Sequence, residues 1–388
     1  MKHGSVASSI ARGMAMKADV IVIGAGTVGA AIAYGLAGRG VRVLAIDGGD
    51  RDFRAATANF GLVWLHGKGM GMPAYQQLTR RSVDLWPDFG AELTATTGID
   101  LQYERNGGLA FCLGEADFAA RRAELQRLHN QLGGGEPDWE MLDRGALTKL
   151  LPRVQLGAEI TGASLGRRDG HANPLHLLAA LHAGIIRRGG RLLGGGAVHA
   201  VRRDGAGGFT VDFGPERASA ARIVIAAGLG SKALAAQVGL DIPIRPQRGQ
   251  ILVTERLEPF LPLPTINIRQ TRAGAVMIGA TNEEAGFDTS TTTDAAAALA
   301  AGALREIPAL SDATLVRQWA GLRILTPDGY PVYAESQSHP GAFVALCHSG
   351  VTLAAEHATR LADAIASGRR PPSLDVFHHR RFDVSKAA

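Results

Sequence analysis

Cysteine is scarce in this 388-residue chain, which contains only Cys112 and Cys347. Two cysteines so far apart give neither the ligand spacing of a metal site nor a disulfide framework. They also cannot hold an iron–sulfur cluster within the chain, because such a cluster needs more thiolate ligands. A reducing compartment fits this composition, so we expect a cytoplasmic protein without a bound metal.

Long apolar runs are also missing. No stretch approaches the roughly 18 consecutive apolar residues of a membrane span, so we expect no membrane-spanning helix. The formal net charge is +5, but lysine and arginine are scattered, and aromatic residues make up only 5% of the chain. The charge pattern therefore does not indicate nucleic-acid binding, and an acidic small-molecule substrate explains it at least as well.

The chain is long enough for one large domain or two interleaved domains with a sizeable core. Its first residues are small and polar and lack the apolar core of a signal peptide, so we expect a disordered leader at residues 1–16. Apolar runs continue between the fifty glycines. Close packing of helices and turns explains this composition better than disorder.

The rest of the chain is organised around residues 20–47. An apolar run is followed by Gly-Ala-Gly-Thr-Val-Gly at 24–29, a small-residue helix pattern, and a second apolar run that ends at Asp47. This order predicts a strand, a tight turn, a helix and a second strand, which is the context that makes a glycine fingerprint specific for a dinucleotide. The motif alone does not separate FAD from NAD.

Each glycine of the fingerprint has a physical role. Gly24 permits the sharp turn, Gly26 lets the backbone approach a pyrophosphate, and Gly29 lets the helix lie close to the strand. Asp47 stands where a carboxylate can bind a ribose hydroxyl. We expect the dinucleotide site to comprise Gly24, Gly26, Thr27, Val28, Gly29 and Asp47.

A segment with large side chains between glycines follows at residues 60–69. Such side chains are costly to expose, so the segment should pack either on a cofactor ring or as a buried connection that supports the core. Further along, residues 139–151 read as a short helix, and the apolar run at 222–225 enters a small-residue turn. This second nucleotide-type strand end predicts one discontinuous sheet.

With these motifs in place, the chain resembles the D-amino-acid oxidase-like (DAO) family of FAD-dependent oxidoreductases. Besides the two strand ends, the resemblance rests on motifs in the right order at residues 245–251, 277–281, 319–323, 326–329 and 348–354, and it covers about residues 18–382. The sequence is most similar to glycine-oxidase-like enzymes and to the β subunits of bacterial opine oxidase, D-hydroxyproline dehydrogenase and hydrogen cyanide synthase.

The resemblance implies an α/β fold, in which an FAD-binding Rossmann-like domain of the GR2 type is interleaved with an α+β substrate domain built on a mixed antiparallel sheet. We expect the FAD-binding domain at residues 17–90, 150–232 and 318–370, the substrate domain at 91–149 and 233–317, and a C-terminal tail at 371–388.

Three residues are the catalytic candidates. Arg323, in a Gly-Leu-Arg motif, is expected to bind a substrate carboxylate through its planar fork. His348 and Asn267 stand where glycine oxidase has an arginine and a tyrosine, so a bulkier amino or imino acid is a better expectation than glycine. His348 either faces the substrate or is a satisfied structural histidine. Polar residues beside glycine turns, such as His66, His171 and Asn173, more often serve the turn.

The implied cofactor is FAD, bound non-covalently. Residues 349–351 are expected to open a C-terminal helix whose N–H groups face the flavin pyrimidine ring. Besides the fingerprint, the expected contacts are Asn59, Phe60, Gly61, Val198, Ala227, Gly228, Ser349, Gly350, Val351 and Thr352.

The resemblance implies oxidation of the C–N bond of an amino or secondary imino acid, of the D-amino acid, D-hydroxyproline or opine type, by hydride transfer to flavin N5. The partners would be a small carboxylate-bearing amine and redox subunits that carry FAD, FMN or an iron–sulfur cluster. Two alternatives stay open: a stand-alone glycine, sarcosine or D-amino-acid oxidase that makes hydrogen peroxide, and an FAD-bound electron-transfer subunit without substrate chemistry. A third, action on a modified nucleic acid base, is less favoured because the sequence shows no added basic or methyltransferase-like domain.

Overall fold

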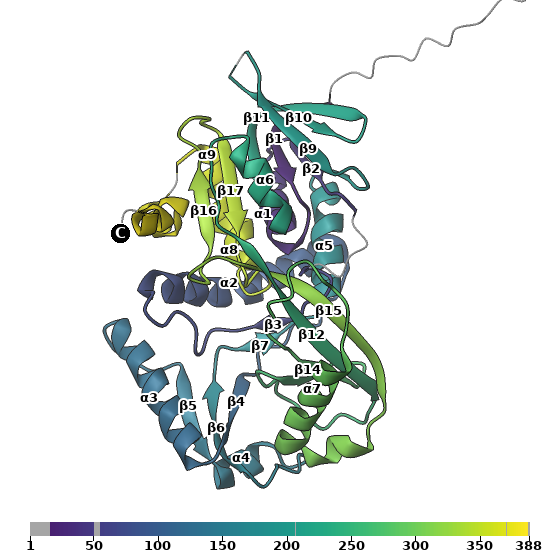
Figure 1. The fold of residues 1–388 in the computed structure, drawn as a ribbon, viewed down its shortest axis with the longest axis vertical. Coiled ribbons are helices and arrows are strands. Elements are labelled where there is room, and N and C mark those ends of the chain that lie inside the picture. Colours follow the sequence, from purple (N-terminus) through teal and green to yellow (C-terminus); the bar gives the residue numbers. More distant parts are fainter. Residues whose placement is uncertain (1–15, 50–54, 206, 370, 387–388) are drawn as a thin grey trace, which may run out of the picture.

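The computed structural model describes residues 16–49, 55–205, 207–369 and 371–386. The leader predicted at residues 1–16 therefore lies outside the described residues, apart from Met16, which begins the first strand. Figure 1 shows a large sheet in the upper half of the molecule and two smaller sheets in the lower half, with helix α2 (Pro73–Thr97) crossing between them.

Within these residues the large sheet has eight strands, five of which run parallel to one another in the order β17-β11-β1-β2-β8. The edge strand β16 and the hairpin β9-β10 are antiparallel additions. The strands are β1 (Met16–Ile23), β2 (Val43–Ile46), β8 (Arg191–Leu193), β9 (Val198–Arg203), β10 (Phe209–Phe213), β11 (Glu216–Ile225), β16 (Val332–Glu335) and β17 (Ala342–Leu346). The discontinuous sheet expected from the two strand ends is thus present.

Both faces of the large sheet are buried, which is why its central strands read as continuous apolar runs. On β1, Val20 and Val22 pack into one core cluster, whereas Ile21 and Ile23 pack into another on the opposite face. Alternation along a strand produces this division, since successive side chains point to opposite faces.

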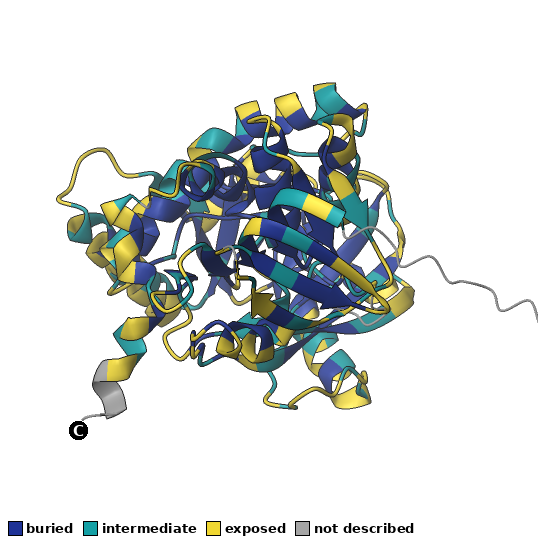
Figure 2. Ribbon diagram, turned by 90° about the horizontal axis from the view of Figure 1, so that it is seen from above, coloured by how far each residue is buried: buried dark blue, intermediate teal, exposed yellow. Residues whose placement is uncertain are grey.

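Helices cover one face of the large sheet (Figure 1). They are α1 (Thr27–Ala37), α5 (Pro174–Arg187) and a C-terminal helix made of α8 (Ala354–Glu356), a π-helical turn (His357–Leu361) and α9 (Ala362–Ser367). Helix α2 packs against α5 and α8. The opposite face packs against β9, β10 and the short helix α6 (Ser231–Ala236). Figure 2 shows the result as a buried interior with exposed residues on the outer turns.

The lower half contains two antiparallel sheets around a third core cluster. One sheet has the order β4-β6-β5, with β4 (Gly108–Leu113), β5 (Trp139–Asp143) and β6 (Ile160–Gly166). The other has the order β13-β14-β12-β15, with β12 (Arg245–Arg256), β13 (Ile268–Gln270), β14 (Ala275–Gly279) and β15 (Leu315–Leu325). Around them lie α3 (Glu115–Gln131), α4 (Arg144–Leu150) and α7 (Thr293–Glu306). A two-stranded ribbon, β3 (Leu62–Val63) with β7 (Gly170–His171), lies between the halves (Figure 1).

The predicted α/β architecture is confirmed, but strand pairing crosses the predicted domain limits. Strand β6 lies in the predicted FAD-binding segment 150–232, yet it pairs with β4 and β5. Strand β15 begins at Leu315, before the predicted limit at 318, and pairs with β12 along its whole length. Strand pairing alone does not divide the chain into domains, so the predicted domain limits stay a prediction.

Two sequence-based helix predictions need correction. The first part of residues 139–151 is strand β5, and the helix begins only after Asp143, whose Oδ1 accepts a hydrogen bond from Ala146 N at 2.7 Å as an N-cap. The C-terminal helix begins at Ala354 and not at Ser349. No helix in the described parts of the chain is long and apolar enough to cross a membrane.

Candidate functional site

The fingerprint turn is shaped by two glycines that the protein itself requires. Gly24 has φ +95°, and a Cβ on it would lie 2.5 Å from the carbonyl oxygen of Ala226. A Cβ on Gly29 would overlap the carbonyl oxygen of Gly24. The second strand end is therefore directly against the first, and Ala226 N donates to Ile23 O at 2.8 Å.

Gly26 differs from these two glycines because no described part of the protein requires it. Its φ is −65°, which any residue can adopt, and a Cβ there would find only Ala56 Cβ at 3.5 Å. The missing side chain leaves a cradle at the start of α1, where backbone N–H groups point outward. Thr27 Oγ1 is buried beside this cradle and has no hydrogen-bond partner among the described residues. A pyrophosphate would occupy the cradle and supply the missing acceptor.

Asp47 lies at the end of β2, as predicted. Its Oδ2 accepts a hydrogen bond from Ala25 N at 2.7 Å and its Oδ1 accepts one from Gly49 N at 2.9 Å. Each carboxylate oxygen keeps a further lone pair for a ribose hydroxyl. On the other side of the turn, Gly228 has φ +57°, and Val198 is a half-buried residue of β9 that packs in the same core cluster as Ile21 and Ile23. These residues fit the nucleotide part of FAD.

The loop at residues 58–63 is clamped from several directions. Asn59 Oδ1 accepts from Gly61 N at 2.7 Å, and a Cβ on Gly61 would overlap the carbonyl oxygen of Ala172. Phe60 O accepts from Arg269 Nε of β13 at 2.6 Å. Trp319 Nε1 of β15 donates to Ala58 O at 3.2 Å. The loop is therefore held between the segment that follows β7 and the strands β13 and β15 of the second sheet.

The segment at residues 349–352 lies beside the fingerprint. A Cβ on Gly350 would lie 3.4 Å from Val28 Cγ2 of α1. Thr352 Oγ1 accepts from Trp64 N at 3.2 Å. Trp86 Nε1 of α2 lies 3.1 Å from the carbonyl oxygens of both Val351 and Thr352. These contacts hold the segment as a turn, which explains why the helix starts later than its sequence suggests.

Arg323 is the predicted residue whose surroundings most resemble a substrate anchor. It lies on β15 opposite Gln247 of β12, and its Nη1 donates to Thr281 O at 2.8 Å. Burial lowers the pKa of Arg323 and the charge of Glu283 partly offsets this, but a guanidinium keeps its proton at neutral pH. Within the described ranges, Arg323 makes no ion pair, so its charge is available to an anion.

Gly249 is a residue that the sequence analysis did not single out. It pairs with Gly321 on β15, and a Cβ on Gly249 would lie 2.6 Å from Arg323 Nη1. The absent side chain gives the guanidinium room to lie across β12. Its place in the Arg-Gly-Gln motif was a visible signal, but its role follows only from the strand register.

His348 lies in the same region as Arg323. Part of its side chain reaches water, but protein surrounds most of the imidazole. This loss of hydration, and then the positive charges of Lys68 and Arg323, lower the pKa of His348 below its usual range. The imidazole is therefore neutral at pH 7 and can donate or accept a hydrogen bond. Lys68, which the sequence analysis did not single out, donates from Nζ to Ser349 Oγ at 2.6 Å.

Asn267 is not brought into contact with these residues. Its side chain is exposed, and its Nδ2 donates to Glu306 Oε1 at 2.8 Å, at the end of α7. Helix α7 packs on the face of the sheet opposite to Arg323, as the core residues Leu252 and Ile278 show. The catalytic role of Asn267 stays a prediction.

The two remaining histidines near glycine turns have buried partners. His66 pairs through Nδ1 with Asp169, and its Nε2 lies 3.1 Å from Ser164 Oγ. His171 Nδ1 lies 3.1 Å from Arg269 Nη1, which makes it the acceptor. Burial, and then the charge of Arg269, lowers the pKa of His171 to about 4. Asn173 caps α5 by accepting from Leu175 N at 3.1 Å.

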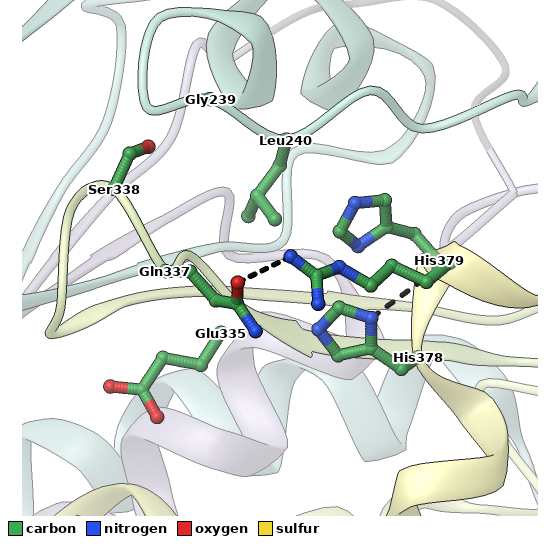
Figure 3. Close-up of a pocket in the computed structure, with 8 residues that line it drawn as sticks. Gly239, Leu240, Glu335, Gln337, Ser338, His378 and His379 are labelled. Atoms are coloured by element: carbon green, nitrogen blue, oxygen red, sulfur yellow. Dashed lines mark hydrogen bonds between the residues drawn. The ribbon is translucent and has the colours of Figure 1, made fainter. Parts of the chain in front are cut away.

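A separate hollow of about 230 Å³ opens beside β16 and the C-terminal segment (Figure 3). In Figure 3 the side chains of His378 and His379 face Leu240 and Gln337 across it. None of its lining residues is a predicted site residue, and its described walls carry no arrangement that would orient a substrate. The chemistry of the fingerprint, Arg323 and His348 therefore defines the candidate site.

Comparison with known proteins agrees with this geometry. A family model described as FAD dependent oxidoreductase (DAO) matches residues 19–364. The B subunit of opine oxidase from Agrobacterium tumefaciens (strain Ach5) is 41% identical over 370 residues, which cover 95% of this chain and 99% of that protein. The corresponding opine oxidase protein of Rhizobium meliloti is 39% identical over 369 residues, with the same coverage. The crystal structure of glycine oxidase from Geobacillus kaustophilus has a TM-score of 0.86 and 27% identity, and covers 94% of this chain and 99% of that one.

Proposed function

The chain belongs to the DAO family of FAD-dependent oxidoreductases and oxidises C–N bonds of amino acids, and we propose that its substrate is a secondary amino acid of the opine type. The single observation that carries this proposal is Arg323, a half-buried guanidinium without an ion pair in the described structure, on the sheet face that clamps the loop at residues 58–60. A planar fork at this place suits a substrate carboxylate.

We propose that FAD lies along the fingerprint, with its pyrophosphate over Gly26 and Thr27 and its ribose at Asp47. The ring would lie between the loop at residues 59–61 and the turn at residues 349–352. The cofactor supplies the two-electron chemistry when bound, by accepting a hydride at flavin N5. We further propose that the FAD-binding domain comprises residues 17–90, 150–232 and 318–370, and the substrate domain residues 91–149 and 233–317.

The protein's own contribution is orientation and charge. Arg323 would hold the carboxylate so that the carbon next to the amine faces the ring. The positive charges of Arg323 and Lys68 disfavour a protonated amine, because like charges lower the pKa of a nearby ammonium group. The amine would therefore keep the lone pair that hydride loss requires. His348, neutral at pH 7, is the proposed polar group near the substrate, whereas the role of Asn267 stays a prediction, because its amide is bonded to Glu306.

We also propose that electrons leave through partner redox subunits, because the opine oxidase relatives are themselves named as subunits of a larger enzyme. Both cysteines are free and buried, and thiols that stay reduced are typical of the cytoplasm, where we place the protein. The alternative is a stand-alone oxidase that produces hydrogen peroxide, which the similarity to glycine oxidase favours.

One experiment tests the proposal and separates these alternatives. The purified flavoprotein is mixed without oxygen with an opine, a D-amino acid, sarcosine and a cyclic imino acid, and flavin bleaching is followed. We expect the opine to reduce the flavin faster than the other amines do at the same low concentration. Air is then admitted: slow reoxidation supports a dehydrogenase subunit, and fast reoxidation supports an oxidase. Bleaching by no amine would refute the proposed substrate class.

A further inference from the structure

The reaction described so far uses only the charge of Lys68 and does not explain why its ammonium is held in one place. Lys68 lies in a Gly-Lys-Gly loop and is only partly exposed. Its Nζ donates to the hydroxyl of Ser349 at 2.6 Å, and it makes no ion pair within the part of the chain that the structure describes. An ammonium has three donors, so two of them are left for water or a ligand.

The surroundings of Lys68 hold its acceptor in place. Ser349 is buried and shares a second hydrogen bond with Tyr75 OH at 2.9 Å. The ring of Tyr75 packs on that of Tyr330, with 5.2 Å between the centroids, and Tyr330 OH donates to Met70 O at 2.6 Å. Contacts from α2 and from the loop after β15 thus fix Ser349, and with it the head of Lys68.

Lys68 and Arg323 together make the region positive. Lys68 is hydrogen-bonded to Ser349, just past the end of β17. A Cβ on Gly228, just past the end of the adjacent strand β11, would lie 3.8 Å from Ile324, the neighbour of Arg323. The acidic residue near Arg323, Glu283, is already committed to Arg248, with 2.7 Å between Arg248 Nη2 and Glu283 Oε2. Two cations that pair with no carboxylate of the described chain repel each other, and an anionic ligand relieves that cost.

We propose that Lys68, with Ser349, binds a second carboxylate of the substrate while Arg323 binds the first, so that the site selects secondary amines that carry two carboxylates. This inference rests on the proposed function, because it assigns the far end of the same substrate. It also separates an opine-type substrate, which has a carboxylate on each side of the nitrogen, from N-methyl amino acids, which have only one.

Binding of inert analogues tests the inference without turnover. Thiodiacetate has two carboxylates and (methylthio)acetate, CH₃–S–CH₂–COO⁻, has one, and neither contains a C–N bond. Calorimetric titration of the FAD-loaded protein should show at least about tenfold tighter binding of thiodiacetate, since one charge-assisted contact is worth roughly that factor or more. A preference below about threefold in the wild-type protein would overturn the inference, whatever the variants do.

Variants then assign the preference to Lys68. Lys68→Met should lower the ratio of the two affinities at least about tenfold, and Lys68→Arg, which keeps the charge, should retain most of it. Lys149→Met, at an exposed position of α4, is the matched control and should keep the wild-type ratio. If Lys68→Met weakens both ligands equally, the second anchor is refuted. If the Lys68→Met variant does not fold, the affinity ratios of the wild-type protein and of Lys68→Arg still test the second anchor.

Turnover gives the second arm of the test. Iminodiacetate and sarcosine share the reacting CH₂–NH group, and the ratio of their kcat/KM values should fall in Lys68→Met as the binding ratio does. If neither amine bleaches the flavin but thiodiacetate still binds through Lys68, the proposed reaction fails while the dicarboxylate site stands. If amines react but the ratio is insensitive to Lys68, the reaction stands and the second anchor fails.

Discussion

The nucleotide side and the substrate side of the site are built in different ways. The nucleotide side is formed by one continuous unit, β1-turn-α1-β2, in which contacts within the unit demand Gly29 and contact with the adjacent strand end demands Gly24. The substrate side is assembled from loops and strands more than 250 residues apart, such as Lys68 with Ser349. Local chemistry therefore decides the first, whereas tertiary packing decides the second.

The largest effect that this comparison predicts concerns Gly29. In Gly29→Val, the new side chain overlaps the Gly24 carbonyl, so α1 cannot lie on β1 and the core of the large sheet cannot close. We expect no folded, soluble protein, as judged by circular dichroism and yield, with or without added FAD. A folded Gly29→Val variant would show that the turn is far more adaptable than its contacts indicate.

Gly26→Val sharpens the same comparison, because this glycine faces only the space left for the cofactor. The apoprotein should fold with its Tm lowered by only about 2 °C, which corresponds to exchanging glycine for a poorer N-cap. FAD retention should be lost, since the side chain occupies the pyrophosphate cradle. The measurements are thermal unfolding of the apoprotein and flavin content after gel filtration; normal FAD content would contradict the placement of the cofactor.

Arg323 tests the substrate side in isolation. Arg323→Ala should lower kcat/KM by about two to three powers of ten, because losing one buried charge-assisted contact costs on the order of 2 to 4 kcal/mol in transition-state binding. Arg323→Lys keeps the charge but loses the fork, so it should rescue only part of the loss. FAD content should hardly change in either variant. Near-normal kcat/KM in Arg323→Ala would mean that the carboxylate binds elsewhere.

The nucleotide side could be predicted from the sequence more fully than the substrate side. The fingerprint, Asp47 and the second strand end were predictable because each role depends on residues close in sequence. Lys68 and Gly249 were not singled out, since a lysine between glycines usually lies in water and a strand glycine has no chemistry of its own. The late start of the C-terminal helix was also hidden, because the buried indole of Trp86, from α2, holds the preceding carbonyls.

A substitution at Gly249 tests whether Arg323 must be held in one position. Gly249→Ala adds a Cβ that would meet the end of the flexible Arg323 side chain, so the guanidinium must shift while the strands stay paired. We expect kcat/KM to fall about tenfold and Tm to change by less than about 2 °C, because the charge is kept but its geometry is lost. The matched control is Gly302→Ala on α7, where a Cβ meets no atom within 4 Å. Equal activities would show that Arg323 needs no fixed position.

The smallest effect on catalysis is expected at Asn267, whose amide donates to the buried carboxyl of Glu306. Burial raises the pKa of Glu306, and the hydrogen bond from Asn267 opposes that rise. Asn267→Ala removes the donor, so the folded-state pKa rises further above that of the unfolded chain. A raised carboxyl pKa leaves stability intact below the unfolded value near 4.5, and stability is lost as the pH rises through the folded value. Asn267→Ala should therefore lower Tm more at pH 8 than at pH 5, while kcat/KM changes less than about threefold. A loss of kcat/KM above about tenfold with an unchanged Tm at both pH values would instead support a substrate-facing Asn267.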